Sequence, residues 1–91
     1  MDFKYENNRI YLENEKGQCT AEVTFPPIDE GKVNINHTYV APALRGKGIA
    51  DMLVRELALY LRKNNLKAIP TCSYAVDWFE KNPQFNDVCK K

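Results

Sequence analysis

The stretch KVNINHTYVAPALRGKGIADMLVRELALYLRKNN (residues 32–65) decides the fold, because it joins a predicted strand to a predicted helix through a glycine-containing loop. Residues 32–40 alternate apolar and polar side chains, which predicts a strand with one buried face. Beyond the loop, apolar residues recur every three or four positions, so we expect a helix near Gly46 to Asn64. The expected inward positions are Val33, Ile35, His37 and Tyr39 in the strand and Ile49, Leu53, Leu57 and Leu61 in the helix.

The residues before this stretch predict antiparallel strands. Residues 3–13 alternate in the same way around Asn7 and Asn8, two residues that tolerate left-handed turn geometry, and this pattern is typical of a hairpin. Residues 18–25 predict a further half-buried strand, which the following two prolines should end.

The residues after this stretch predict a crossover and a second helix. Residues 67–71 follow a strand and a helix, so they should return parallel to the strand at 32–40. Pro70 has no N–H to donate, and this strand should therefore be only partly paired and should separate from its neighbour. A second helix is expected over residues 73–82, capped by Ser73 and stopped by the proline that follows. Together these elements predict an α+β fold with a mostly antiparallel sheet.

Length and composition set limits on the class of protein. A chain of 91 residues is expected to form one domain, residues 1–91. The formal net charge of +1 creates no broad field toward nucleic acid or anionic lipid, and no apolar run could span a bilayer, so a cytoplasmic location is the default expectation. The three cysteines, Cys19, Cys72 and Cys89, are widely spaced and predict neither a disulfide framework nor a metal site.

The loop Arg45-Gly46-Lys47-Gly48 is a candidate anion site. Its glycines allow backbone amides to approach a ligand closely, and the following helix N-terminus adds free N–H groups and a positive dipole end. Arg45 and Lys47 add charge that suits phosphate oxygens. The alternative is a tight turn with two solvated cations. The spacing matches neither a Walker loop nor the dinucleotide fingerprint.

Arg45-x-x-Gly48-x-Ala50 after the strand segment His37-Thr38-Tyr39-Val40 resembles the acetyl-CoA signature of GCN5-related N-acetyltransferases. The resemblance extends over the whole chain and is closest to the small YjdJ-type subgroup of that superfamily. It implies a minimal fold of this type, in which the parallel strands on either side of the long helix splay apart and a helix follows.

The resemblance also implies roles for particular residues. Acetyl-CoA would be the co-substrate, with its pantetheine arm bonded to backbone groups of Tyr39 and Val40. Its pyrophosphate would lie on the loop and helix start formed by Arg45, Gly46, Lys47, Gly48, Ile49 and Ala50. The acceptor would be an amine that the sequence does not identify.

Two departures from the larger members affect these expectations. Asn7-Asn8 stands where larger members insert two helices that commonly wall the acceptor site, so an open acceptor side is expected. The last helix lacks the tyrosine that often serves as general acid. Its corresponding positions hold Cys72, Ala75, Trp78 and Phe79.

Two residues are candidates for the chemistry, Cys72 and His37. A helix N-terminus would lower the thiol pKa of Cys72 and favour a nucleophile or general acid, although a small buried residue shaping the site is the alternative. His37 could serve as a base, but its expected position on an apolar face favours a core role. Tyr74 could donate a proton from its phenol, but Tyr74 and Trp78 stand at helical i,i+4 spacing and are more simply a packing pair.

The leading hypothesis is therefore transfer of acetyl from acetyl-CoA to an amine, directly or through an acetyl-Cys72 intermediate. The alternative is a non-catalytic acyl-CoA binding or sensing domain, because the usual acid and the acceptor walls are missing. A redox-active thiol protein of another fold is a weaker third reading, since no resolving cysteine lies near Cys72.

Overall fold

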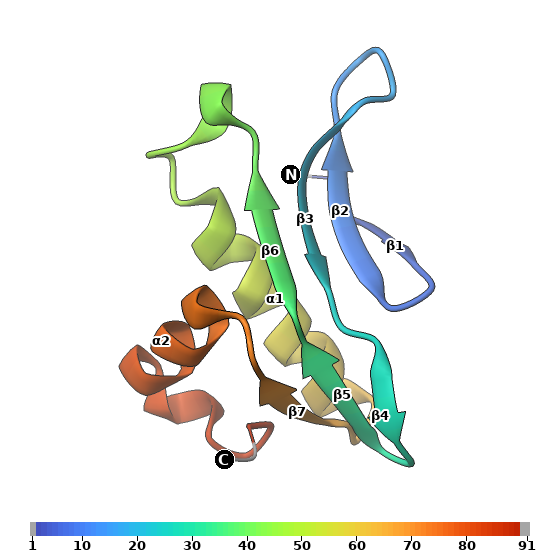
Figure 1. Cartoon of the computed structure of the whole chain (residues 1–91), viewed down its shortest axis with the longest axis vertical. Helices are drawn as coiled ribbons and strands as arrows, with labels where there is room; N and C mark the ends of the chain where they lie inside the picture. Colours follow the sequence, from blue (N-terminus) through green and yellow to red (C-terminus); the bar gives the residue numbers. More distant parts are fainter. Residues whose placement is uncertain (1, 90–91) are drawn as a thin grey trace.

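The strand expected over residues 32–40 is divided in two at Asn36 (Figure 1). The computed structural model describes residues 2–89. The strands are β1 (Lys4–Glu6), β2 (Arg9–Glu13), β3 (Cys19–Thr24), β4 (Pro27–Asp29), β5 (Lys32–Ile35), β6 (His37–Val40) and β7 (Lys67–Pro70). The helices are α1 (Ile49–Lys63) and α2 (Ser73–Lys81), with short 3-10 turns at Pro42–Leu44 and Pro83–Phe85.

The two halves of the divided strand belong to different sheets. β6 closes an antiparallel sheet of order β1-β2-β3-β6, whereas β5 lies between β4 and β7 in a second sheet. β5 and β7 run parallel, with Lys32 opposite Lys67 and Ile35 opposite Pro70. The predicted α+β architecture is confirmed, including the parallel return through α1 and the separation of the strands, which occurs where β6 leaves for the other sheet. β7 itself is paired with β5 along its whole length, so the expectation from Pro70 that this strand is only partly paired is wrong.

The break corrects the prediction of which side chains in this segment face the core. Val33 and Ile35 are buried as expected, but His37 and Tyr39 are exposed and Thr38 takes the inward position. Successive side chains of a strand point to opposite faces, so one irregular residue reverses the alternation beyond it. The expectation that His37 occupies an apolar face is therefore wrong.

Three local boundaries also differ from the sequence expectation. α1 begins at Ile49 and not near Gly46, because Gly48 before it has a left-handed φ of 75°. Ser73 is the first residue of α2 and does not cap it, since Cys72 occupies the N-cap position. The prolines after β3 end that strand, but the chain re-enters the second sheet at once as β4, which the sequence analysis did not predict.

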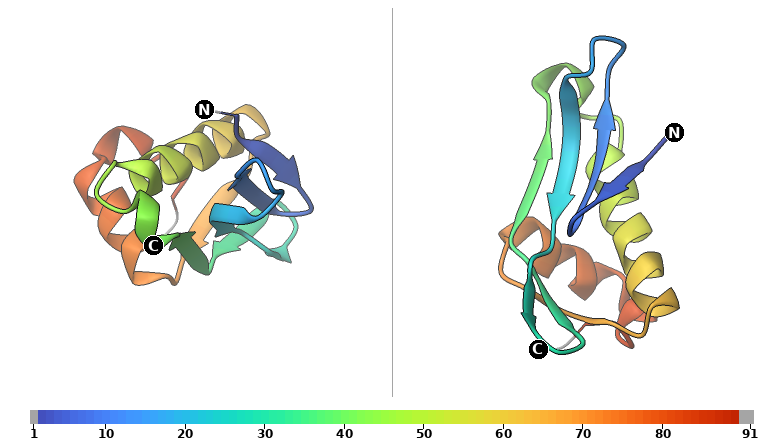
Figure 2. Two further views of the ribbon diagram at one scale, coloured as in Figure 1. Left: turned by 90° about the horizontal axis from the view of Figure 1, so that it is seen from above. Right: turned by 90° about the vertical axis from the view of Figure 1, so that its right-hand side faces the viewer.

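Helix α1 supplies much of the core. Figure 2 shows the strands as one curved layer with α1 along one side of it. The buried stripe of α1 comprises Ile49, Leu53, Val54, Leu57, Ala58 and Leu61. These side chains pack in one cluster with buried residues of both sheets and of α2, so the amphipathic pattern of the sequence translates directly into the layer contact. Among the described residues, no helix has the length and apolar character needed to cross a membrane.

The segment after α2 is anchored to the end of α1 and to β7. Arg62 makes two hydrogen bonds to Asp87, of 2.8 and 2.7 Å, and donates a third of 2.9 Å to the Gln84 carbonyl. The Ala68 N–H of β7 donates to the Val88 carbonyl at 2.7 Å. This segment therefore covers the side of β7 that faces away from β5.

We predict that Asp87→Asn lowers the urea midpoint of unfolding at neutral pH. The hydrogen bonds from Arg62 hold the pKa of Asp87 below its usual range, so the stabilisation is present above the unfolded pKa, about 3.9, and is lost as pH falls through the folded pKa. The difference between variant and parent should therefore shrink as pH falls below the unfolded pKa and disappear once pH is below the folded pKa. Asp77→Asn, at an exposed position of α2, is the matched control, and an equal effect of both substitutions would contradict the role of the pair.

Candidate functional site

The loop between β6 and α1 holds both of its glycines in the left-handed backbone conformation. Gly46 and Gly48 have φ values of 83° and 75°, a conformation that side-chain-bearing residues rarely adopt. An added Cβ at either glycine would meet open space, so the glycines are required by conformation and not by crowding. Lys47 between them is exposed.

This loop lines a pocket of about 230 Å³ that also reaches β6 and α2. Arg45 folds back toward the strand, where its Nε donates to the Val40 carbonyl at 3.0 Å. The pocket is lined by Val40, Leu44, Arg45, Gly46, Gly48, Ile49, Ala50, Asp51 and Tyr74. The structure thus brings most of the residues proposed for the pyrophosphate into one concavity with a residue of α2.

Asp51 ties the start of α1 to α2. Its Oδ1 accepts a 2.7 Å hydrogen bond from Nε1 of Trp78, and Nη2 of Arg55 lies 3.7 Å from the same oxygen. Trp78 is only 4% exposed, so its N–H has exchanged water for this carboxylate. Burial, together with the Asp51 charge, raises the pKa of Tyr74. No spacing pattern in the chain signals the pairing of Asp51 with Trp78.

The edge of β6 that faces away from β3 has no neighbouring strand within residues 2–89. The Ala41 N–H donates to the Thr20 carbonyl of β3 at 2.8 Å. Hydrogen-bonded positions alternate along an antiparallel ladder, so the backbone groups of Tyr39 point toward β3 and those of Thr38 and Val40 point toward the open edge. This edge is a row of polar groups that an extended ligand can pair with.

Cys72 lies across from this edge, at the start of α2. Its half-buried Sγ is 3.7 Å from Oγ1 of Thr38. Burial raises the pKa of the thiol, but the backbone N–H of Ala75, the Thr38 hydroxyl and the backbone N–H groups of Tyr74 and Thr38 together outweigh it and lower the pKa. The thiol of Cys72 therefore loses its proton more readily than that of an ordinary cysteine.

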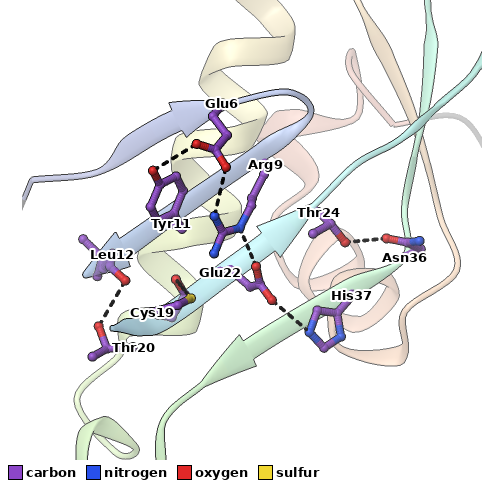
Figure 3. A network of polar contacts seen from close by, with 11 residues as sticks. Glu6, Arg9, Tyr11, Leu12, Cys19, Thr20, Glu22, Thr24, Asn36 and His37 are labelled. Carbon is purple, nitrogen blue, oxygen red and sulfur yellow. Dashed lines mark hydrogen bonds and ion pairs between the residues drawn. The ribbon is translucent and has the colours of Figure 1, made fainter. Parts of the chain in front are cut away.

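His37 lies on the outer face of the antiparallel sheet, in a network of charged side chains (Figure 3). Its Nε2 is 3.6 Å from Oε2 of Glu22 on β3, and its side chain is 52% exposed. The other oxygen of Glu22 accepts a 2.6 Å hydrogen bond from Nε of Arg9, which also pairs with Glu6 at 3.3 Å. Arg9 lies over the ring of Tyr11, 3.9 Å from its centroid.

The two catalytic candidates therefore face different sides of β6. His37 points to the outer network, whereas Cys72 contacts Thr38, the next residue along the strand, whose side chain points inward.

Sequence reasoning missed Glu22, Arg9 and Thr38. Glu22 and Arg9 occupy outward positions of adjacent strands, so strand alternation could have identified them once the pairing of these strands was assumed.

Comparison with known proteins shows the family. A family model described as GCN5-related N-acetyl-transferase matches residues 9–88. The chain belongs to this family. It is 32% identical over 63 residues to Protein NATD1 of Xenopus tropicalis, a match that covers 69% of this chain and 58% of the length of NATD1.

Solved structures of the family agree with the fold. A solution structure of a GCN5-like protein from Staphylococcus aureus superposes with a TM-score of 0.82 at 32% identity, covering 98% of this chain and 87% of that one. Tetrahymena GCN5 gives a TM-score of 0.64 at 13% identity, with 80% of this chain and 48% of that chain covered. The second likeness concerns the fold alone.

The helix contact in this family member is testable through its single tryptophan. Asp51→Ala should lower the free energy of unfolding by about 1–3 kcal/mol, because the buried Trp78 N–H loses its acceptor. Asp51→Asn keeps an acceptor oxygen and should cost less, although both variants lose the favourable charge at the helix start. Urea unfolding followed by tryptophan fluorescence measures the difference, and equal stabilities of the two variants would contradict the assigned hydrogen bond.

Proposed function

We propose that this protein is an acetyl-CoA-dependent N-acetyltransferase whose co-substrate lies along the open edge of β6. The observation that carries the proposal is the continuity of three features. The loop pocket at the start of α1, the unpaired edge of β6 and the thiol of Cys72 follow one another along a single line of contacts. The three features lie in the same order as the parts of acetyl-CoA. The charged loop would meet the pyrophosphate, the polar edge the pantetheine, and the thiol the thioester.

The pyrophosphate would bind at the loop pocket. The amides from Gly46 to Ala50 and the dipole of α1 favour negative charge, and Arg45 and Lys47 supply cations. Asp51 also lines the pocket, but its carboxylate is committed to Trp78 and Arg55 and therefore opposes a phosphate less than a free acid would.

The pantetheine arm would pair with the backbone of β6. Its amides resemble a peptide strand, and β6 offers it the C=O of Thr38 and the N–H of Val40 on the open side. The Val40 carbonyl also accepts from Arg45, and the Thr38 N–H faces the Cys72 sulfur. The contact assigned to Tyr39 from the resemblance would then have to come from its exposed side chain, because its backbone groups face β3.

Cys72 can serve the transfer in two ways. As a nucleophile, its thiolate attacks the acetyl carbonyl carbon, a new S–C bond forms, and the S–C bond to CoA breaks to release CoA thiolate. An amine then attacks acetyl-Cys72, the C–N bond forms, and the thiolate is regenerated while the amine proton passes to solvent or to a base. As a general acid, the thiol instead gives its proton to departing CoA thiolate during direct attack by the amine.

The acceptor side suits an amine that is held loosely. Asn7-Asn8 forms a tight turn between β1 and β2, with Asn8 at a φ of 62°, and the outer face of the sheet carries the charged network around Glu22. His37 lies on that face and would accept a proton from an approaching ammonium group in the direct route.

We expect Gly48→Glu to weaken CoA binding about 10- to 100-fold, because a side chain and a like charge would stand among the phosphate-binding amides. Gly17→Glu is the matched control. Gly17 has a φ of 76°, against 75° for Gly48, and an added Cβ meets open space at both positions. The two substitutions should therefore strain the backbone alike. Isothermal titration calorimetry with CoA would reject the assigned pyrophosphate site if both variants bound like the parent.

Replacement of Cys72 should separate turnover from binding. Cys72→Ala is expected to leave CoA affinity nearly unchanged and to lower transfer by at least about a hundredfold. The measurement is release of free CoA from acetyl-CoA in the presence of a panel of primary amines.

Intact mass after incubation with acetyl-CoA distinguishes the two routes. A covalent route gives one added acetyl group that is absent in Cys72→Ser and present in the Cys19→Ser and Cys89→Ser variants, whereas an acid role gives no adduct but a lower rate. Full transfer by Cys72→Ala would exclude both roles and leave His37 as the next residue to replace. Tight CoA binding without turnover of any amine in the parent would favour an acyl-CoA sensing domain.

A further inference from the structure

Thr38 of β6 lies opposite Cys72 at the start of α2, where its side chain can act on the Cys72 sulfur. The break at Asn36 turns the Thr38 side chain inward, where its hydroxyl is 3.7 Å from the Cys72 sulfur. The ladder alternation directs the Thr38 N–H toward the same open edge. One residue of β6 therefore presents both a hydroxyl and a backbone N–H to the sulfur of Cys72, the N-cap residue of α2.

We propose that Thr38 is the positioning residue for Cys72, holding its sulfur at the open edge of β6 and stabilising the thiolate through its hydroxyl. The proposal rests on the proposed function for its catalytic meaning, but the contact itself can be tested without acetyl-CoA. The thiol donates to the hydroxyl when protonated, and the hydroxyl rotates to donate to sulfur once the proton leaves. A threonine can therefore serve both protonation states, which valine cannot.

The other groups around the sulfur are accounted for. The first amides of α2, those of Tyr74 and Ala75, face it from its own element and also favour the thiolate. On β6 the titratable side chains His37 and Tyr39 lie on the opposite, exposed face. From α1, Asp51 is directed to Trp78. The Thr38 hydroxyl is thus the side-chain donor from across the gap, and its removal should change the chemistry of the sulfur selectively.

The test measures the alkylation rate of Cys72 by iodoacetamide over a range of pH, in the folded full chain, with peptide masses resolving the three cysteines. Thr38→Val keeps the shape and backbone but removes the hydroxyl. We expect its Cys72 rate at neutral pH to fall about 3- to 10-fold, with the rate reached at high pH unchanged, because the midpoint of the profile moves upward. Thr38→Ser should restore the parent profile.

Thr20→Val is the matched control, because Thr20 is a half-buried strand threonine whose hydroxyl bonds to the Leu12 carbonyl. Its Cys72 profile should match that of the parent, and Cys19 and Cys89 serve as internal references in every sample. If Thr38→Val fails to fold by circular dichroism, Thr38→Ala and Thr38→Ser provide the same comparison with and without a hydroxyl.

A Cys72 profile that is identical with and without the hydroxyl would overturn the proposal, whatever the transfer assay gives. If alkylation shifts as expected but Cys72→Ala keeps full transfer, the positioning contact stands and the catalytic role of Cys72 fails. The two ideas therefore fail in different experiments.

Discussion

One carbonyl group, that of Ile35, marks the point at which the two sheets separate. It accepts hydrogen bonds from the N–H groups of both Thr71 and Cys72, at 3.0 and 3.1 Å. Both lone pairs of this carbonyl are therefore used by the residues that directly follow β7. Beyond it, Asn36 turns to β3, with its N–H 3.3 Å from the Thr24 carbonyl and its Oδ1 2.6 Å from the Thr24 hydroxyl. The carbonyl at which β5 last contacts the chain leaving β7 thus also holds the backbone of Cys72 in place.

This fork explains why a small chain can keep part of a strand edge open. An unpaired edge is normally a liability, because its polar groups seek another strand. Here the helices α1 and α2 pack against the two diverging segments, β6 and the chain that follows β7, and keep them apart. The contact of Asp51 with Trp78 fixes the start of α1 against α2, and Trp78 packs in turn against Phe79 and Phe85 at centroid distances of 5.1 and 5.4 Å. The open edge is therefore a consequence of helix packing and does not rely on the loop alone.

The sequence was sufficient for the order and type of the main elements, because the alternation of the strands and the stripe of α1 are strong periodic signals. It was insufficient at Asn36. A single irregular residue carries no periodic signature, yet it reverses which side chains point inward, so His37 is exposed and Thr38 is half-buried on the inner face. The short β4 was missed for a related reason, since two adjacent prolines predict an end and β4 resumes directly from the second of them. The loop proposed for the pyrophosphate could be singled out because glycine and charge are local signals, whereas the hydrogen bond between Asp51 and Trp78 depends on tertiary packing.

The two faces of β6 give the two chemical routes different requirements. A covalent route uses the inner face, where Thr38 and Cys72 meet and where the surroundings are half-buried. A direct route also needs a base for the amine, and the histidine of this strand is on the outer face beside Glu22. A thioester lying along the edge between these faces would be reachable from both, so the inner thiol and the outer imidazole need not touch each other to serve one reaction. The proposed function would then separate the group that acts on the CoA sulfur from the group that acts on the acceptor nitrogen. The acceptor would then be selected by the exposed outer face, and variation in that face could change the amine without disturbing the backbone contacts that bind the co-substrate.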